Sequence, residues 1–119
     1  MRVLVVDDQK RTRQSLKVLL KTLPGTVEVE EAINGREAVQ LAPDLQPDLV
    51  LMDALMPEMD GVEATRQIKQ ICPRAKVIVL SMYSEYQSQA AQVGADAFVS
   101  KGDPAERLVA TIATVLGLP

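Results

Sequence analysis

The feature that most constrains the fold is a run of four apolar residues, Leu49–Met52, that leads directly into a single carboxylate, Asp53. The turn-forming residues Pro57 and Asp60-Gly61 follow soon after. A short apolar run bounded by turn signals predicts a strand that is buried on both faces of a parallel sheet. Asp53 is then expected at the carboxyl end of this strand, where open α/β sheets bind their ligands. A buried charge is costly there unless it is paired or takes part in chemistry.

Three other apolar runs end in polar side chains in the same way: Arg2–Val6 before Asp7-Asp8, Lys76–Leu80 before Ser81, and Ala97–Ser100 before Lys101. If the strands are parallel neighbours, their carboxyl ends bring three carboxylates together at one edge of the sheet. Such like charges destabilise the fold, and a hard cation such as Mg²⁺, held by carboxylates, waters and phosphate oxygens, relieves the repulsion. With a hydroxyl and an ammonium group added, the set has the parts needed to place a phosphoryl group on a carboxylate.

The segments between these runs carry helix signals. An apolar stripe predicts a first helix that ends at Pro24-Gly25: Leu16, Leu19, Leu20 and Leu23. Capping-box patterns predict the starts of four later helices: Asn34 to Glu37, Asp60 to Glu63, Ser84 to Gln87, and Asp103 to Glu106, with Pro104 at the first helical position. The alternating stretch Val27–Ala32 predicts an edge strand. Five strands alternating with five helices predict an α/β fold whose parallel sheet is covered by helices on both faces.

Prolines, apolar spacing and charge refine this picture. Pro43 and Pro47 are expected to bracket the connection into the strand at Leu49, and the helix from Ser84 is expected to run to Val93. Core-facing positions are expected in the helix after Asp60: Val62, Ile68 and Ile71. The first helix carries a basic face that is interpreted either as solvated or as a docking or dimer surface: Lys10, Arg11, Arg13, Lys17 and Lys21.

Composition limits the classes of protein to which the chain can belong. Its 119 residues, 47% of them hydrophobic, are expected to form one domain with one core, residues 1–119. The net charge of −3 argues against direct binding of nucleic acid. No apolar run approaches the roughly 20 residues that span a bilayer, and the chain leads straight into a strand, so neither a membrane anchor nor a signal peptide is expected. Cys72, the only cysteine, is expected to be an inert structural thiol, and a cytoplasmic location is expected.

The order of these residues resembles the receiver domain of bacterial response regulators over nearly the whole chain. The resemblance rests on motifs that follow one another in the family's order: Asp7-Asp8, Asp53, Met56-Pro57 with Asp60-Gly61, Ser81, Gly94–Phe98 and Lys101. The sequence Gly-Ala-Asp-Ala-Phe-Val-Ser-Lys, with no proline after the lysine, is most similar to the NarL/FixJ-type subfamily. The resemblance implies a flavodoxin-like (βα)5 fold with a five-stranded parallel sheet in the order 2-1-3-4-5.

The resemblance also implies a role for each polar residue at the strand ends. Asp53 would be the phosphoacceptor, which attacks phosphorus and forms an aspartyl phosphate. Mg²⁺ would be held by Asp8, Asp53 and the backbone carbonyl of Leu55, with Asp7 acting through a metal-bound water. Taken alone, Asp53 could equally be a helix-capping or loop residue, and the alternative for the Asp7-Asp8 pair is an N-cap of the first helix.

Two further residues are expected to bind the phosphoryl group, and one to report its arrival. Lys101 would follow a phosphate oxygen as a compact cation, and Ser81 would donate a hydrogen bond to another. Phe98 occupies the position of the family's switch aromatic and is expected to turn into the space that Ser81 vacates. The surface formed by the fourth helix, fifth strand and fifth helix would then change.

The chain departs from the common family pattern at the switch. Ser81 stands where threonine is common, Phe98 where tyrosine is common, and Met82 where a small residue is usual. Leu55 and Met82 are expected to crowd the phosphoryl group and hinder attack by water. The sequence therefore predicts a long-lived phosphoryl group, an expectation that a half-life of seconds would contradict.

The resemblance implies a histidine kinase as the phosphodonor, since the chain itself contains no histidine. Expected outputs are a homodimer on activation and DNA binding through an output domain that is absent from this sequence. Three alternatives compete with this reading. A receiver-like interaction module would keep the pocket but never be phosphorylated. A haloacid-dehalogenase-type phosphatase would need a second acid at Leu55, and a flavodoxin-like electron carrier would need a Gly- and hydroxyl-rich loop in place of Asp7-Asp8.

Overall fold

A computed structural model describes residues 1–25 and 27–119 of the chain. Strands and helices alternate throughout, in the order β1 (Arg2–Val6), α1 (Lys10–Leu20), β2 (Glu28–Ala32), α2 (Gly35–Leu45), β3 (Leu49–Asp53), α3 (Gly61–Ile71), β4 (Lys76–Ser81), α4 (Tyr86–Gln92), β5 (Ala97–Ser100) and α5 (Ala105–Leu116). The predicted βα alternation is therefore confirmed.

The strands form one parallel sheet in the order β2-β1-β3-β4-β5, as the family resemblance implied. All five residues of the central strand β3 are buried, which explains why its sequence is an unbroken apolar run. The register pairs Val6 at the end of β1 with Met52 in β3. The residues that follow each of these, Asp7 and Asp53, therefore lie side by side at the carboxyl edge of the sheet.

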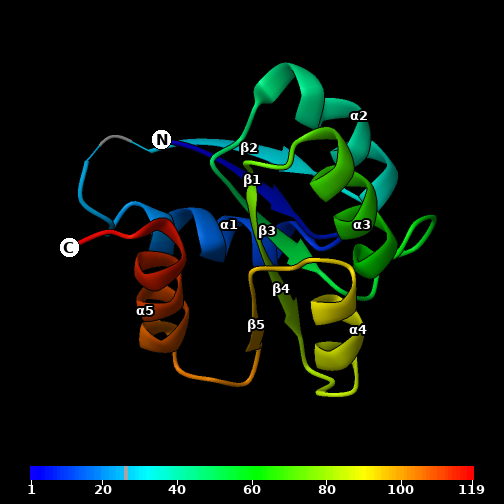
Figure 1. The fold of residues 1–119 in the computed structure, drawn as a ribbon. Helices are drawn as coiled ribbons and strands as arrows, with labels where there is room; N and C mark the ends of the chain where they lie inside the picture. The colour runs from blue at the N-terminus through cyan, green and yellow to red at the C-terminus, as the bar shows by residue number, and fades with distance from the viewer. Residues whose placement is uncertain (26) are drawn as a thin grey trace.

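Helices cover both faces of the sheet, with α1 and α5 on one face and α2, α3 and α4 on the other (Figure 1). Each face has its own apolar cluster. Leu20 of α1 and Ile112 of α5 pack on the first face, whereas Ala38 of α2, Ala64 of α3 and Ala90 of α4 pack on the second. Small residues on the second face let the helices approach the sheet closely. Nowhere in the described part of the chain does a helix combine the length and apolarity needed to cross a bilayer.

The starts of α4 and α5 differ from the capping-box predictions. Before α4, Ser84 accepts the Gln87 N–H through its backbone carbonyl instead of capping with its side chain, and the helix proper spans only Tyr86–Gln92. Pro104 is the N-cap of α5, so this helix begins at Ala105, one residue later than predicted, and the proline side chain has no acceptor atom. The patterns at α2 and α3 are confirmed as N-caps, because Asn34 Oδ1 accepts the Glu37 N–H and Asp60 Oδ1 accepts the Glu63 N–H.

Three boundary and core predictions also need correction. Helix α1 ends at Leu20, before Pro24-Gly25. Pro43 lies inside α2 and not in the connection to β3, because the helix continues to Gln46, whose N–H donates to Ala42 O at 2.9 Å and whose side-chain amide donates to Pro43 O at 2.7 Å. Ile71 of α3 is 47% exposed, since Thr65 and Ile68 lie on the buried side of that helix instead.

The connection from β3 to α3 contains one residue with unfavourable backbone geometry. Glu58 has a φ of 71°, a left-handed conformation that costs an L-residue about 1–2 kcal/mol. Its ion pair with Arg36, at 3.9 Å and exposed at both ends, offsets little of this cost. We therefore expect Glu58→Asn to raise the free energy of unfolding by up to about 1 kcal/mol, measured by urea denaturation, because asparagine tolerates this conformation. Glu58→Ala, which removes the ion pair with Arg36 but does not relieve the backbone, is the matched control, and equal stability of the two variants would contradict the prediction.

Candidate functional site

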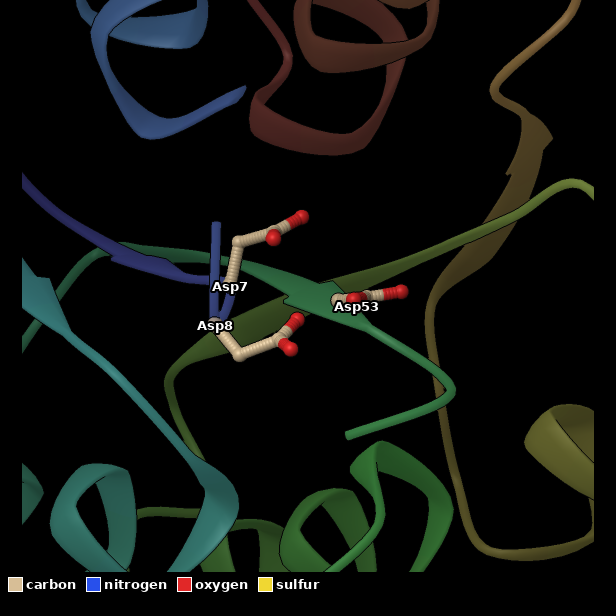
Figure 2. Close-up of side chains that lie close together, drawn as sticks. All are labelled: Asp7, Asp8 and Asp53. Carbon is tan, nitrogen blue, oxygen red and sulfur yellow. The ribbon is translucent and has the colours of Figure 1, made fainter. Parts of the chain in front are cut away.

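Three carboxylates converge at the carboxyl edge of the sheet. Asp7 and Asp8 follow β1, and Asp53 is the last residue of β3. One carboxylate oxygen from each lies within 4.8 Å of the other two. Figure 2 shows Asp7, Asp8 and Asp53 at neighbouring strand ends. Asp7 and Asp53 are only 1% and 6% exposed, whereas Asp8 is exposed. The cluster is therefore a buried pair of acids with one acid on its solvent side.

Lys101 lies between the two buried acids. Its Nζ is 3.0 Å from Asp7 Oδ2 and 3.1 Å from Asp53 Oδ1. Burial lowers the pKa of Lys101, but the hydrogen bond to Asp7 and the charge of Asp53 outweigh it, so its pKa is raised and it remains a cation. Burial raises the pKa of Asp53, and the neighbouring Asp7 adds to this effect, while Lys101 opposes it. Lys101 thus partly neutralises the repulsion that the sequence predicts among the acids.

Backbone amides orient the same two carboxylates. Asp7 Oδ1 accepts the Gln9 N–H at 2.9 Å, and Asp53 Oδ1 accepts the Leu55 N–H at 3.4 Å. The structure thus brings Leu55 to the site through its amide, and the proposed role of its carbonyl stays a prediction. The donor set fits Mg²⁺ because carboxylate oxygens are hard ligands, and the exposed side at Asp8 leaves room for the waters that Mg²⁺ retains.

Ser81 is the last residue of β4, next to β3, and Phe98 lies within the neighbouring strand β5. Ser81 is 2% exposed, and its Oγ accepts the Tyr83 N–H at 3.0 Å, which leaves the O–H of the hydroxyl available as a donor. Lys101 N donates to Ser81 O at 3.0 Å, which couples the two strand ends. Phe98 is half-buried against the apolar cluster under α4 and lines a cavity of about 200 Å³ with Ala90 and Ala91.

Two large side chains near the site are open to solvent. Leu55 follows Asp53 by two positions and is 54% exposed, and Met82 follows Ser81 and is 63% exposed. Whether they shield an aspartyl phosphate from water stays a prediction, as does the long phosphoryl lifetime.

The solvated interpretation of the basic face of α1 fits its exposed members Lys10, Arg11 and Lys21, but not the whole face. Arg13 and Lys17 are neither simply solvated nor free for docking, because Arg13 Nε and Lys17 Nζ bind the two carboxylate oxygens of Glu31 on β2, at 2.9 and 3.2 Å. The hydrogen bond from Arg13, followed by that from Lys17, lowers the pKa of Glu31. Arg13 Nη1 also donates a hydrogen bond to the backbone carbonyl oxygen of Asp7 at 2.8 Å. The only sequence signal for these contacts was the charge of Glu31 on a predicted edge strand.

Comparisons with known proteins show the family to which the chain belongs. Residues 3–113 match the family described as the response regulator receiver domain. The chain is 39% identical over 113 residues to the transcriptional regulatory protein YdfI of Bacillus subtilis, covering 93% of this chain and 53% of YdfI. It is 41% identical over 102 residues to the response regulator protein VraR of Staphylococcus aureus, covering 84% of this chain and 49% of VraR. The chain thus spans about half the length of these relatives.

The fold has equally clear counterparts among solved structures. A two-component response regulator of the LuxR family from Aurantimonas sp. superposes with a TM-score of 0.90 and 33% identity, over 98% of this chain and 84% of that one. The likeness to LuxR-family regulators is consistent with the NarL/FixJ-type subfamily that the sequence of Gly94–Lys101 indicated. The chain belongs to the receiver domain family of two-component response regulators.

Proposed function

We propose that this receiver is switched by phosphorylation of Asp53, with a histidine kinase as donor. The observation that carries the proposal is the placement of Lys101 Nζ within 3.1 Å of both Asp7 and Asp53, beside the exposed Asp8. An oxygen of Asp53 would attack the phosphorus of the donor's phosphohistidine, so that a carboxyl O–P bond forms as the P–N bond breaks and the imidazole leaves. The buried cation beside Asp53 would then stabilise the added negative charge.

The acids of the site have distinct proposed roles. Asp8, Asp53 and the Leu55 carbonyl would hold Mg²⁺ directly, and Asp7 would act through a water. Bound Mg²⁺ would neutralise charge on the transferring phosphoryl group. Lys101 would exchange its contact with Asp53 for a phosphate oxygen while keeping Asp7 as an anchor. Because Asp7 is almost completely buried, it is better suited to anchor Lys101 than to meet a metal directly.

Phosphorylation would be read out at the surface of α4, β5 and α5. Ser81 would move toward the phosphoryl group and donate its O–H to a phosphate oxygen, and Phe98 would turn toward the space that Ser81 leaves. The relatives that match are about twice as long as this chain. We infer that residues 1–119 are a single receiver domain, and that an output domain absent from this sequence would bind DNA, with activation by homodimerisation in the cytoplasm.

The direct test is the intact mass of the protein after incubation with acetyl phosphate and Mg²⁺. The wild type is expected to gain one phosphoryl mass, and Asp53→Asn is expected to gain none because the amide is not a nucleophile. Omitting Mg²⁺ should also abolish the gain. Beryllium fluoride, which mimics a phosphoryl group, is the control for a pocket that small donors cannot reach. Failure of both would favour a receiver-like interaction module that is never phosphorylated.

The metal site can be tested separately by replacing Asp8 with alanine. In EDTA the variant is expected to melt at a higher temperature than the wild type, because one charge is removed from a cluster of three. The gain should be small, since Asp8 is exposed. Mg²⁺ should raise the melting temperature of the wild type but not of the variant. A lower melting temperature for Asp8→Ala in EDTA would show that the acids do not share one pocket.

A further inference from the structure

Arg13 connects α1 to the acidic site through the backbone. It lies one turn into the helix, where its N–H donates to Gln9 O at 3.1 Å. Its side chain is only 12% exposed and points back toward the end of β1, where Nη1 donates to the carbonyl oxygen of Asp7 at 2.8 Å. The same guanidinium donates from Nε to Glu31 at 2.9 Å. One guanidinium therefore joins the edge strand to the turn that carries two of the three acids.

The carbonyl that Arg13 binds belongs to the peptide between Asp7 and Asp8. A peptide unit is planar, so fixing its oxygen also fixes the direction in which the chain continues into Asp8. This matters because successive side chains of an extended strand point to opposite faces, whereas the carboxylates of Asp7 and Asp8 approach within 4.8 Å of each other. The strand must therefore end at Val6, and the 7–8 peptide must be held in a turned orientation.

The other hydrogen bonds of this turn do not involve the carbonyl oxygen that Arg13 binds. The Asp7 N–H donates to Ala32 O at 3.2 Å, and Asp7 Oδ1 accepts the Gln9 N–H. These two hydrogen bonds hold the chain on either side of the peptide between Asp7 and Asp8, whereas Arg13 binds the carbonyl oxygen of that peptide. Glu31 in turn holds Arg13, with Lys17 on its second oxygen at 3.2 Å. A lysine at position 13 would lack the planar fork that reaches a carboxylate and a carbonyl together.

We propose that Arg13 is a positioning residue for the Mg²⁺ site, because it fixes the Asp7-Asp8 peptide so that both carboxylates face Asp53. This inference rests on the proposed phosphorylation-dependent function and adds a residue outside the acidic cluster to its metal site. The charge of Arg13 and its orienting contacts have opposite effects on the affinity of the site for Mg²⁺. A cation near three acids weakens binding of a second cation by repulsion, whereas a residue that orients the ligands strengthens it.

Mg²⁺ affinity, measured by isothermal titration calorimetry without any phosphodonor, separates these two effects. Arg13→Gln is expected to weaken Mg²⁺ binding about 10- to 100-fold, the usual effect of losing a residue that orients metal ligands. Lys17→Gln is the matched control, because it also removes one cation from Glu31 but has no bond to Asp7. Its affinity should stay within about twofold of the wild type. Hydrogen exchange of the Gln9 amide in EDTA should be faster in Arg13→Gln only.

The outcomes distinguish this inference from the proposed function. Unchanged or tighter Mg²⁺ binding by Arg13→Gln would overturn the positioning role while leaving the metal site intact. Absence of Mg²⁺ binding by the wild type would overturn the proposed site itself, and this inference with it. Should Arg13→Gln fail to fold, as judged by its circular dichroism, Arg13→Lys replaces it. That variant keeps the charge but not the fork, so it too should bind Mg²⁺ more weakly than Lys17→Gln.

Discussion

Replacing Gly61 with alanine is expected to lower the free energy of unfolding by about 3 kcal/mol or more, because the added methyl group has no space. A Cβ at this position would overlap the carbonyl oxygen of Asp53 and lie 2.9 Å from the Cα of Ala54. The Gly61 N–H also donates to Ala54 O at 2.9 Å, which holds the start of α3 against the end of β3. Alanine normally favours a helix over glycine by about 1 kcal/mol, so the clash should reverse the usual sign.

Thermal denaturation provides the measurement, with a decrease of roughly 10 °C or more expected for a domain of this size. Gly102→Ala is the matched control, since a Cβ there would meet its neighbours only at 3.7 Å or beyond. Its melting temperature should stay close to that of the wild type. Because the clash falls on the backbone of Asp53, Gly61→Ala should also be phosphorylated more slowly by acetyl phosphate at temperatures where it remains folded. A melting temperature equal to that of the control would show that α3 can shift away from β3 at little cost.

Replacing Lys101 with methionine is expected to destabilise the metal-free protein by about 3 kcal/mol, because it leaves two buried carboxylates without their shared cation. Methionine keeps an unbranched side chain of similar length and removes only the charge and its donors. Lys101 is 3.0 Å from Asp7 and 3.1 Å from Asp53, and both acids are almost fully buried. The loss should therefore exceed that of an exposed ion pair such as Arg2 with Glu28.

A double-mutant cycle measured by urea denaturation in EDTA identifies the cause. Adding Asp53→Asn to Lys101→Met should recover part of the lost stability, since one of the unpaired charges is then gone. The proposed metal site further predicts that Mg²⁺ stabilises Lys101→Met at least as much as the wild type, because the lysine no longer competes for the acids. Strict additivity of the two substitutions would mean that Lys101 stabilises the fold through packing instead of charge.

The sheet and its acidic edge were predictable because both follow from local patterns. Buried parallel strands need apolar runs, and such runs end where polar side chains begin, as at Met52 and Asp53. The rule that parallel strands present their carboxyl ends at one edge then brings Asp7, Asp8 and Asp53 together without knowledge of the coordinates. The order of the strands came from the family resemblance, since periodicity alone does not determine which strands are neighbours.

The helix starts show where local patterns stop being sufficient. Asn34 and Asp60 form the N-cap bonds that their patterns predict, but Ser84 does not. A capping-box pattern shows which side-chain hydrogen bonds are available at the start of a helix. It does not show whether the backbone forms a competing turn there instead. Before α4, successive turns with i to i+3 bonds, from Tyr83 to Tyr86 and from Ser84 to Gln87, replace the side-chain cap. Ile71 was expected in the core but is exposed, because apolar spacing along a helix does not determine exactly which side faces the sheet.

The sequence by itself determined the alternation of strands and helices, the apolar core and the chemical types gathered at the carboxyl edge, because these depend on residue types at short spacings. Only the tertiary structure decided how the charges pair. Lys101 meets Asp7 across 94 positions, and Arg13 meets Glu31 across 18. A long flexible cation can satisfy any acid within reach, so its partner is decided by the strands and helices that bring the two groups together. For the same reason, the contact of Arg13 with the Asp7 carbonyl could be found only once β1, β2 and α1 were in place.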